Sequence, residues 1–305
     1  MTQRNKQIST LANCDQVVVY GANGWMGRSA LDFLISNSPN FSSQSVLLIG
    51  SKPGNIQING QPFEILDPSA GFSAIRENSI FFNAAFLRRE NLQRMSPQQY
   101  LLRNQEIVEI AKNAIWHKKL FSFINLSSGA ARDFDKQNNQ QASDEYSRLK
   151  KSLEVEYSEI GNQTGVPIVN CRIFSLSGRY LNEFENLALS SFVNQARSKN
   201  YIEVLSPGTR RTYVDGTDLA GVLLSAGSVG NNANFDSGGI LVSMLELAEK
   251  VAEVLDVTSL KIIPGKGEPS DYFGEYEEFN HFAEKFGYSI RGIEDQIQTT
   301  LEAFN

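Results

Sequence analysis

The chain has 305 residues, 41% of them hydrophobic, and this length and composition are typical of a globular protein with one large or two modest domains. Its net charge of −6 at pH 7 argues against a nucleic-acid-binding protein, which would have a basic surface. Two cysteines and two histidines, widely separated in the sequence, argue against a metal site, a disulfide framework and a Ser-His-Asp nucleophile. The polar start and the lack of an apolar run of about 20 residues predict neither a secretion signal nor a membrane span, and therefore a cytoplasmic protein.

Short apolar segments alternate with helical segments through the first half of the chain. Such alternation is typical of right-handed crossovers in a parallel sheet, and nearly continuous apolar strands suit a sheet that is covered on both faces. The predicted fold class is therefore α/β, a Rossmann doubly wound parallel sheet. We predict strands at 16–20, 45–50, 63–66, 79–83, 120–126 and 166–174, and helices at 26–36, 96–117 and 144–161.

The pattern changes after residue 175, where glycine, proline and charged residues become frequent. We expect residues 1–175 to form the Rossmann domain and residues 176–305 to form mainly a smaller domain that covers the substrate, with segments near 210–240 returning to the sheet. Helices are predicted there at 185–198, 217–226, 243–255 and 276–286.

Three glycines follow the first predicted strand and open the first predicted helix. The first glycine permits a tight turn, the second lets a pyrophosphate approach the backbone, and the third lets helix and strand pack closely. The helix N-terminus then offers N–H groups to the phosphates. In this context the spacing predicts a dinucleotide-binding turn. The residues expected to contact the cofactor here are Gly21, Asn23, Gly24, Trp25, Met26 and Gly27.

The end of the second strand bears on which dinucleotide binds. An NAD site usually has a carboxylate there, about 20 residues after the turn, to bind the ribose 2′-hydroxyl, whereas this chain has Gly50-Ser51-Lys52. Ser51 can donate to a 2′-phosphate and Lys52 can neutralise it, with help from Arg28, so NADP(H) is favoured and NAD(H) remains the alternative. Solvated surface charge is the other interpretation of the two cations. Asp67, at the end of the third strand, could accept from the adenine amino group or serve as a turn residue.

Tyr146 and Lys150 lie four positions apart and therefore share one face of the predicted helix at 144–161. An ammonium group near a phenol lowers the phenol pKa from about 10, so Tyr146 can exchange a proton with a carbonyl or an alcohol. Ser128 follows the strand predicted at 120–126, and the carboxyl ends of parallel strands are where ligands bind. We therefore expect Ser128 to bond a substrate oxygen, although a simple turn also explains it.

These motifs resemble the extended short-chain dehydrogenases/reductases, the nucleotide-sugar epimerase/dehydratase/reductase family, over nearly the whole chain. The resemblance implies hydride transfer between a nicotinamide and a sugar carbon, with Ser128, Tyr146 and Lys150 as catalytic residues and Asn104 steadying the lysine. It implies cofactor contacts from Ala84, Ala85, Phe174, Tyr146 and Lys150, and substrate contacts from Ser128, Ser175 and Arg211, the last to the nucleotide diphosphate.

Some positions depart from the family pattern. Ser175 stands where many members carry asparagine, and Glu268 stands where many carry a second phosphate-binding arginine, which Lys266 could replace. These departures bear on the substrate and not on the oxidoreductase scaffold. Arg88 and Arg89 are weaker candidates for binding substrate phosphate. The alternative is that both are surface residues of a loop.

Three family reactions can be compared at these positions. Dehydratases add an Asp-Glu pair after the catalytic serine or threonine, and this chain has Gly129 and Ala130 there, so dehydration is set aside. The missing carboxylate after the second strand favours an NADP-dependent reductase of a 4-keto-6-deoxy nucleotide sugar. An NAD-dependent nucleotide-sugar epimerase is the alternative, and a non-catalytic NADP-binding sensor or scaffold is the second alternative. The resemblance also implies a homodimer formed through the helices at 96–117 and 144–161.

Overall fold

The protein is represented by a computed structural model that describes residues 14–37, 45–136, 145–181, 187–263 and 270–304. The chain forms two compact units. The first unit comprises Met1–Arg172 with Ala220–Phe235, and the second comprises Ile173–Leu219 with Asp236–Asn305. The chain thus leaves the first unit, returns to it for one segment and leaves it again.

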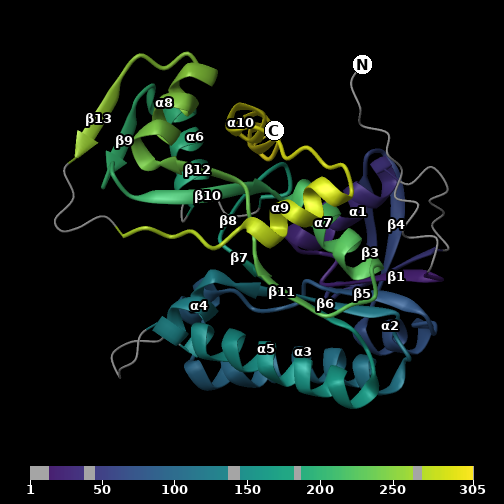
Figure 1. Ribbon diagram of the computed structural model, residues 1–305. Coiled ribbons are helices and arrows are strands. Elements are labelled where there is room, and N and C mark those ends of the chain that lie inside the picture. The colour runs from purple at the N-terminus through teal and green to yellow at the C-terminus, as the bar shows by residue number, and fades with distance from the viewer. Residues whose placement is uncertain (1–13, 38–44, 137–144, 182–186, 264–269, 305) are drawn as a thin grey trace. The chain divides into compact units, whose positions relative to one another are not determined.

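An eight-stranded sheet forms the centre of the first unit (Figure 1), with strand order β11-β7-β6-β5-β1-β2-β4-β3. The pairs β1–β2, β1–β5, β5–β6 and β2–β4 are parallel, which confirms the predicted Rossmann sheet. Among the pairs of this sheet whose register is defined, one is antiparallel, that of the edge strand β3 with β4. The bounds are β1 Gln16–Tyr20, β2 Val46–Ile49, β3 Gly54–Ile58, β4 Gln61–Leu66, β5 Ser79–Asn83, β6 Ser122–Ser128, β7 Ile168–Ile173 and β11 Ala233–Asp236.

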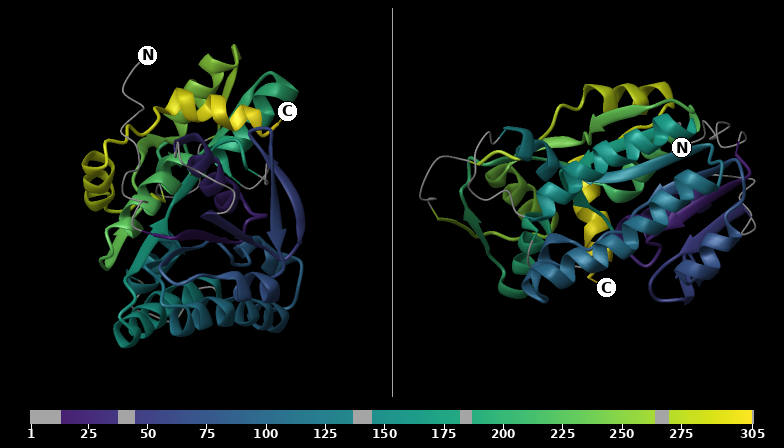
Figure 2. Two further views of the ribbon diagram at one scale, coloured as in Figure 1. Left: turned by 90° about the vertical axis from the view of Figure 1, so that its right-hand side faces the viewer. Right: turned by 90° about the horizontal axis from the view of Figure 1, so that it is seen from below.

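Two long helices, α3 (Pro97–His117) and α5 (Glu145–Thr164), lie side by side along one face of this sheet (Figures 1 and 2). A capping box at Ser96 fixes the start of α3, because the Ser96 hydroxyl accepts from the backbone of the third helical residue. Aromatic side chains fill the space between sheet and helices: Phe123 of β6 packs on Tyr157 of α5 with ring centroids 4.9 Å apart. Burial of such rings contributes to the stability of this face.

The opposite face of the sheet carries α1 (Trp25–Asn37) and the part of α7 (Gly216–Ser228) that belongs to the first unit. A β-carbon on Gly221 of α7 would collide with the ring of Phe33 in α1, so the two helices are in direct contact. Shorter helices of this unit are α2 Pro68–Ala74, η3 Arg89–Gln93 and α4 Gly129–Lys136.

The second unit has its own hydrophobic core, in which buried side chains of α6, α8 and α10 pack against β9 and β10. It contains a three-stranded sheet of order β12-β10-β8 and a two-stranded sheet of β13 and β9. Its elements are β8 Ser175–Ser177, α6 Ala188–Lys199, β9 Ile202–Leu205, β10 Arg210–Asp215, β12 Ile240–Ser243, α8 Met244–Val254, β13 Leu260–Ile263, α9 Glu277–Lys285 and α10 Ile293–Glu302.

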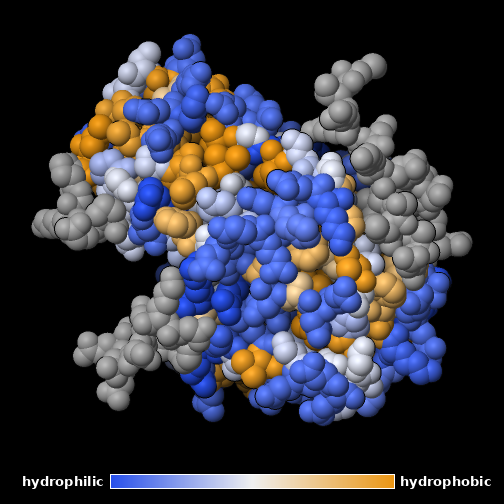
Figure 3. All heavy atoms as spheres, in the orientation of Figure 1, coloured by the Kyte–Doolittle hydropathy of each residue, from blue (hydrophilic) through white to orange (hydrophobic). Residues whose placement is uncertain are grey.

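Some large hydrophobic side chains are exposed. Leu102, Trp116 and Val155 lie on α3 and α5, the helices through which the resemblance implies a dimer, and dimerisation stays a prediction. In the second unit, Figure 3 shows hydrophobic side chains at the surface over β9 and β13, where Leu205 and Ile262 are exposed. Within the described ranges no helix combines the length and the apolar character needed to cross a membrane.

Candidate active site

The glycine turn between β1 and α1 is shaped by contacts that admit no side chain at two of its positions. Gly21 has φ +92°, and a β-carbon there would lie 2.7 Å from the backbone of both Ala84 and Ala85. A β-carbon on Gly27 would collide with the carbonyl oxygen of Gly21, so α1 packs directly on the turn. These contacts match the roles expected for the first and third glycines.

The middle of the turn has the properties of a diphosphate site. A β-carbon on Gly24 would meet one atom among the described residues, the Gly21 carbonyl oxygen at 3.3 Å. Among those residues, the space above Gly24 is otherwise open. Helix α1 begins at the next residue and has no acidic side chain in its first turn, so its first N–H groups face no competing anion. The indole Nε1 of Trp25 and the Nε of Arg28 are buried without a hydrogen-bond partner among the described residues. The turn therefore fits the diphosphate of a dinucleotide.

Asn23 connects this turn to the loop after β2. Its Nδ2 donates to the Lys52 carbonyl oxygen at 3.1 Å, and the Lys52 N–H donates to Asn23 Oδ1 at 3.3 Å. A β-carbon on Gly50 would collide with that Oδ1, which explains glycine at this position. Ser51 and Lys52 are exposed, so the loop presents both side chains to solvent or to a ligand.

Asp67 has a defined structural role at the start of α2. Its Oδ1 accepts from the N–H groups of Ser69 and Ala70, at 2.9 and 3.1 Å, so it is the N-cap of the helix. The turn role that was one alternative for Asp67 is therefore present, and an adenine contact stays a prediction.

Asn104 of α3 holds the segment that follows β5. Its Oδ1 accepts from the Leu87 N–H at 2.9 Å, and Tyr100 donates its hydroxyl to the Leu87 carbonyl oxygen at 2.7 Å. The Asn104 Nδ2 donates to the Tyr100 carbonyl oxygen. Both polar groups of Asn104 thus bond backbone, which fixes the segment that begins with Ala84 and Ala85; its proposed action on Lys150 stays a prediction.

Ser128 is the last residue of β6, at the carboxyl edge of the sheet, and is 7% exposed. Its Oγ accepts from the Ala130 N–H at 3.3 Å, so the hydroxyl caps the first turn of α4. Since this bond uses a lone pair, the hydroxyl hydrogen can still be donated to a substrate oxygen.

Tyr146 lies in the first turn of α5 and is half-buried. Its ring makes an edge-to-face contact with Phe86, with centroids 5.9 Å apart, and the guanidinium carbon of Arg89 lies 5.5 Å from its centroid. The ring is therefore held by an aromatic residue from the segment after β5 and by a cation from η3.

Lys150 is buried one turn further along α5. Its Nζ donates to the Leu126 carbonyl oxygen at 2.8 Å and lies 3.9 Å from the centroid of the Phe86 ring. Burial lowers the pKa of Lys150 to about 7, and the opposing effect of the Glu154 carboxylate only partly offsets it. Near neutral pH the side chain can therefore gain or lose a proton.

Glu154 joins three elements of the first unit. Its carboxylate accepts two bonds from Arg172 at the end of β7, at 2.9 and 2.7 Å, and one from the Ser127 hydroxyl of β6 at 2.6 Å. It is 4% exposed. The sequence reasoning missed Glu154, although it lies four positions after Lys150 and so continues the spacing that identified Tyr146 and Lys150.

The remaining candidates belong to the second unit. Phe174 packs on Tyr272, with ring centroids 4.9 Å apart, and buried Ser175 pairs with Tyr213 in the sheet. Arg211 lies in β10, and its guanidinium carbon is 5.8 Å from the Tyr272 centroid. The Arg211 Nε is buried and has no hydrogen-bond partner among the described residues, which suits a residue that binds an anion. Lys266 lies outside the described residues.

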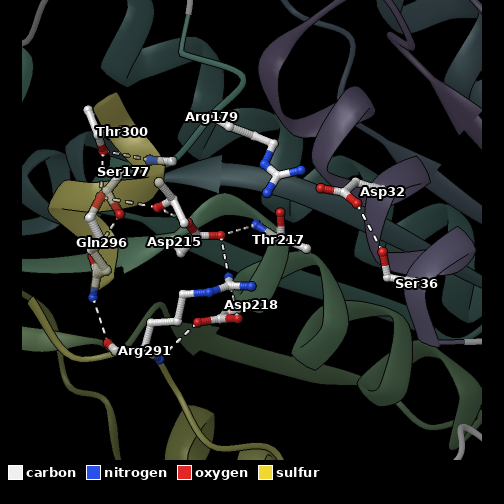
Figure 4. A network of polar contacts seen from close by, with 12 residues as sticks. Asp32, Ser36, Ser177, Arg179, Asp215, Thr217, Asp218, Arg291, Gln296 and Thr300 are labelled. Atoms are coloured by element: carbon white, nitrogen blue, oxygen red, sulfur yellow. Dashed lines mark hydrogen bonds and ion pairs between the residues drawn. The ribbon is translucent and has the colours of Figure 1, made fainter. Parts of the chain in front are cut away.

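A buried polar network supports the end of β10 in this unit (Figure 4). Arg291 donates from one nitrogen to Asp215 at 2.8 Å and to Asp218 at 2.7 Å. Thr299 also donates to Asp215, at 2.8 Å. Asp218, which lies in the first turn of α7, therefore forms an ion pair with Arg291.

Comparison with known proteins agrees with this arrangement. Residues 17–234 match the model of the NAD dependent epimerase/dehydratase family, which confirms the resemblance seen in the sequence. No curated protein matches the chain significantly.

Solved structures with similar folds include nucleotide-sugar enzymes at low sequence identity. UDP-N-acetylglucosamine 4-epimerase from Methanobrevibacter ruminantium, in complex with UDP-N-acetylmuramic acid, has 16% identity and a TM-score of 0.73 over 96% of this chain and 98% of that chain. UDP-glucuronic acid 4-epimerase from Bacillus cereus, with UDP-glucuronic acid and NAD, has 16% identity and a TM-score of 0.70 over 94% and 98%. A dTDP-glucose 4,6-dehydratase from Streptomyces venezuelae has 13% identity and a TM-score of 0.69 over 95% and 96%.

Proposed function

Because this chain belongs to the NAD-dependent epimerase/dehydratase family, we propose that it oxidises and reduces a carbon of a nucleotide sugar and that the net reaction is epimerisation at C4. The observation that carries the proposal is the set of candidate site residues that the first unit contains. There the glycine turn fits a dinucleotide diphosphate, Ser128 ends a central strand, and Tyr146 and Lys150 follow on one helix. The similar structures support C4 as the reacting position, because several are named 4-epimerases.

In the proposed reaction the side chains of this chain move and hold one proton. When the sugar alcohol is oxidised, the Tyr146 oxygen accepts the hydroxyl proton, and it returns that proton when the carbonyl is reduced. Ser128 donates a hydrogen bond to the same sugar oxygen. Lys150 supplies positive charge near the phenol while it is protonated. A dinucleotide held through its diphosphate at the glycine turn would supply the hydride acceptor and donor, and Arg211 would bind the substrate diphosphate.

A reductase is the second candidate, favoured by one specific observation. The loop after β2 carries exposed Ser51 and Lys52 and no carboxylate, which suits the 2′-phosphate of NADP. A reductase that consumes NADPH and acts on a 4-keto-6-deoxy nucleotide sugar would use the same Tyr146 and Ser128. Asn23 would then hold the loop in place through its two bonds to the Lys52 backbone.

One experiment separates the candidates. The purified protein is incubated with UDP-glucose, UDP-N-acetylglucosamine or UDP-glucuronic acid without added cofactor, and the sugar is followed by NMR. A C4 epimer that forms without added cofactor supports the epimerase. Oxidation of NADPH on addition of a 4-keto-6-deoxy nucleotide sugar, without any epimer, supports the reductase.

Tyr146→Phe is the control for both activities. It should lower turnover by about 100-fold or more, the usual effect of losing a general acid, while cofactor binding is retained. If the wild-type protein binds cofactor and shows neither activity, the proposal is wrong and a non-catalytic sensor or scaffold is favoured.

A further inference from the structure

A second cation lies beside the candidate catalytic tyrosine. Arg89 is the first residue of η3, and its guanidinium carbon is 5.5 Å from the centroid of the Tyr146 ring. The resemblance to the enzyme family assigns the positive charge at this tyrosine to Lys150 alone. In the structure, the Lys150 ammonium donates to the Leu126 carbonyl oxygen and contacts the ring of Phe86.

Arg89 is anchored, although its side chain is exposed. One of its terminal nitrogens donates to the Ser147 hydroxyl at 3.1 Å, and Ser147, which directly follows Tyr146, is 6% exposed. The guanidinium therefore contacts the ring of one residue and bonds the side chain of the next. A planar guanidinium is well suited to pack on a ring and donate in its plane at the same time.

The two cations differ in how they respond to pH. Burial lowers the pKa of Lys150 to about 7, so its ammonium loses its charge as the pH rises through neutrality. A guanidinium stays protonated throughout this range. Above neutral pH, therefore, Arg89 keeps a positive charge beside Tyr146 after Lys150 has become neutral.

We propose that Arg89 is a positioning residue for proton transfer, which holds the Tyr146 ring and supplies a positive charge that favours its phenolate. The proposal deepens the proposed function and rests on it for the chemical role of Tyr146. The electrostatic effect itself does not depend on which sugar reacts.

Other charged groups near Tyr146 have ion-pair partners, which reduce their electrostatic effect on the Tyr146 phenol. Glu145 and Arg148, on the same helix, form an ion pair with each other. Glu154, further along α5, is paired with Arg172. Among the described residues, the charged side chains on the elements that pack around Tyr146 include Arg88, Arg89 and Glu90 from the η3 segment, Arg132 from α4, and Glu145, Arg148, Lys150, Lys151 and Glu154 from α5.

The test measures ionisation of Tyr146 directly, by tyrosinate absorbance during a pH titration. The signal of Tyr146→Phe is subtracted from that of the wild type, and the same subtraction is made in an Arg89→Gln background. Loss of a unit charge 5.5 Å from the ring centroid, in a largely aqueous environment, should raise the midpoint by about half a pH unit. Arg89→Lys should restore part of the effect, because it keeps the charge and loses the planar packing.

Arg94→Gln is the matched control, since it removes the same charge from an exposed position at the end of the same short helix. Its midpoint should equal that of the wild type. An unchanged midpoint in Arg89→Gln, or an equal rise in Arg94→Gln, overturns the proposal. The titration needs no substrate, so it decides the role of Arg89 even if neither proposed activity is found. Where turnover is measurable, the alkaline shift should also appear in the pH profile of kcat/KM.

Discussion

Lys150 should destabilise the folded protein below neutral pH, and its replacement by methionine should reveal this. The ammonium is buried, and its pKa falls from 10.5 to about 7 on folding. The folded state therefore binds fewer protons than the unfolded state between these two values. By linkage, the free energy of unfolding contributed by this group rises as the pH increases from about 7 to 10.5, and the full destabilisation is present below pH 7.

The size of the effect follows from the two pKa values. The interval from 7 to 10.5, at 1.36 kcal/mol for each pH unit, corresponds to about 5 kcal/mol. Lys150→Met keeps a side chain of similar length that has no charge to desolvate. The variant should be more stable than the wild type at pH 6, and the difference in unfolding free energy between the two should diminish by about 5 kcal/mol towards pH 10.5.

Urea unfolding of both proteins at several pH values between 6 and 10.5 measures this difference, and the other titrating groups cancel in it. Lys151→Met, which removes the next lysine on the same helix, is the control, and a pH dependence as large as that of Lys150→Met would contradict a specific effect of the buried ammonium. A difference between Lys150→Met and wild type that stays constant over this range would refute the inference that the ammonium is desolvated in the folded state.

Three further changes test other parts of the structure. Gly27→Ala should abolish dinucleotide binding measured by fluorescence titration, because its β-carbon collides with the Gly21 carbonyl; binding at wild-type affinity would contradict the described turn. Lys52→Ala should weaken NADPH binding by about fivefold, the effect of losing one exposed charge pair with phosphate, and leave NADH binding unchanged; an equal loss for both would show that Lys52 does not recognise a 2′-phosphate. Asp215→Ala should lower the unfolding free energy by about 2 kcal/mol, since Arg291 keeps its partly buried charge and loses one partner; a loss below about 1 kcal/mol would show that Asp218 alone satisfies the arginine.

The parallel part of the sheet was predictable because its strands are apolar on both faces. Residues 16–20 and 79–83 are buried throughout, and the apolar runs at their centres, 17–20 and 80–82, need no tertiary information to be recognised. The edge strand β3 was missed because it is short, contains only two apolar residues, Ile56 and Ile58, and is mostly exposed. Its signal was present in the turn, since Asn59 and Gly60 both have positive φ and an Asn-Gly pair is typical of a two-residue hairpin.

The second unit was less predictable from sequence, for a different physical reason. Its strands have three to six residues, which is too short for an alternating pattern to stand out. They form through long-range pairing, as where Arg211 and Val242 are paired across β10 and β12. Helices such as α8 were recognisable because Ser243 and Glu246 form a capping box before an apolar periodic run.

The candidate catalytic residues show where spacing stops being informative. The interval between Tyr146 and Lys150 predicts that both lie on one face of a helix, and that inference needs only the helical period. It does not predict that Phe86 contacts both of them, because that contact depends on how Asn104 and Tyr100 fix the segment after β5.

Glu154 makes contacts of the same long-range kind, which connect helix α5 to two strands of the sheet. A carboxylate buried at 4% exposure is costly unless it is bonded on all sides, and its partners are Ser127 and Arg172. Ser127 precedes Ser128, and Arg172 is the last residue of the first segment of the first unit. The same carboxylate therefore links the helix of Tyr146 to the strand of Ser128 and to the last strand before the second unit. Its buried charge also raises the pKa of Lys150, so the bonds that order this edge of the sheet keep the lysine closer to its protonated form.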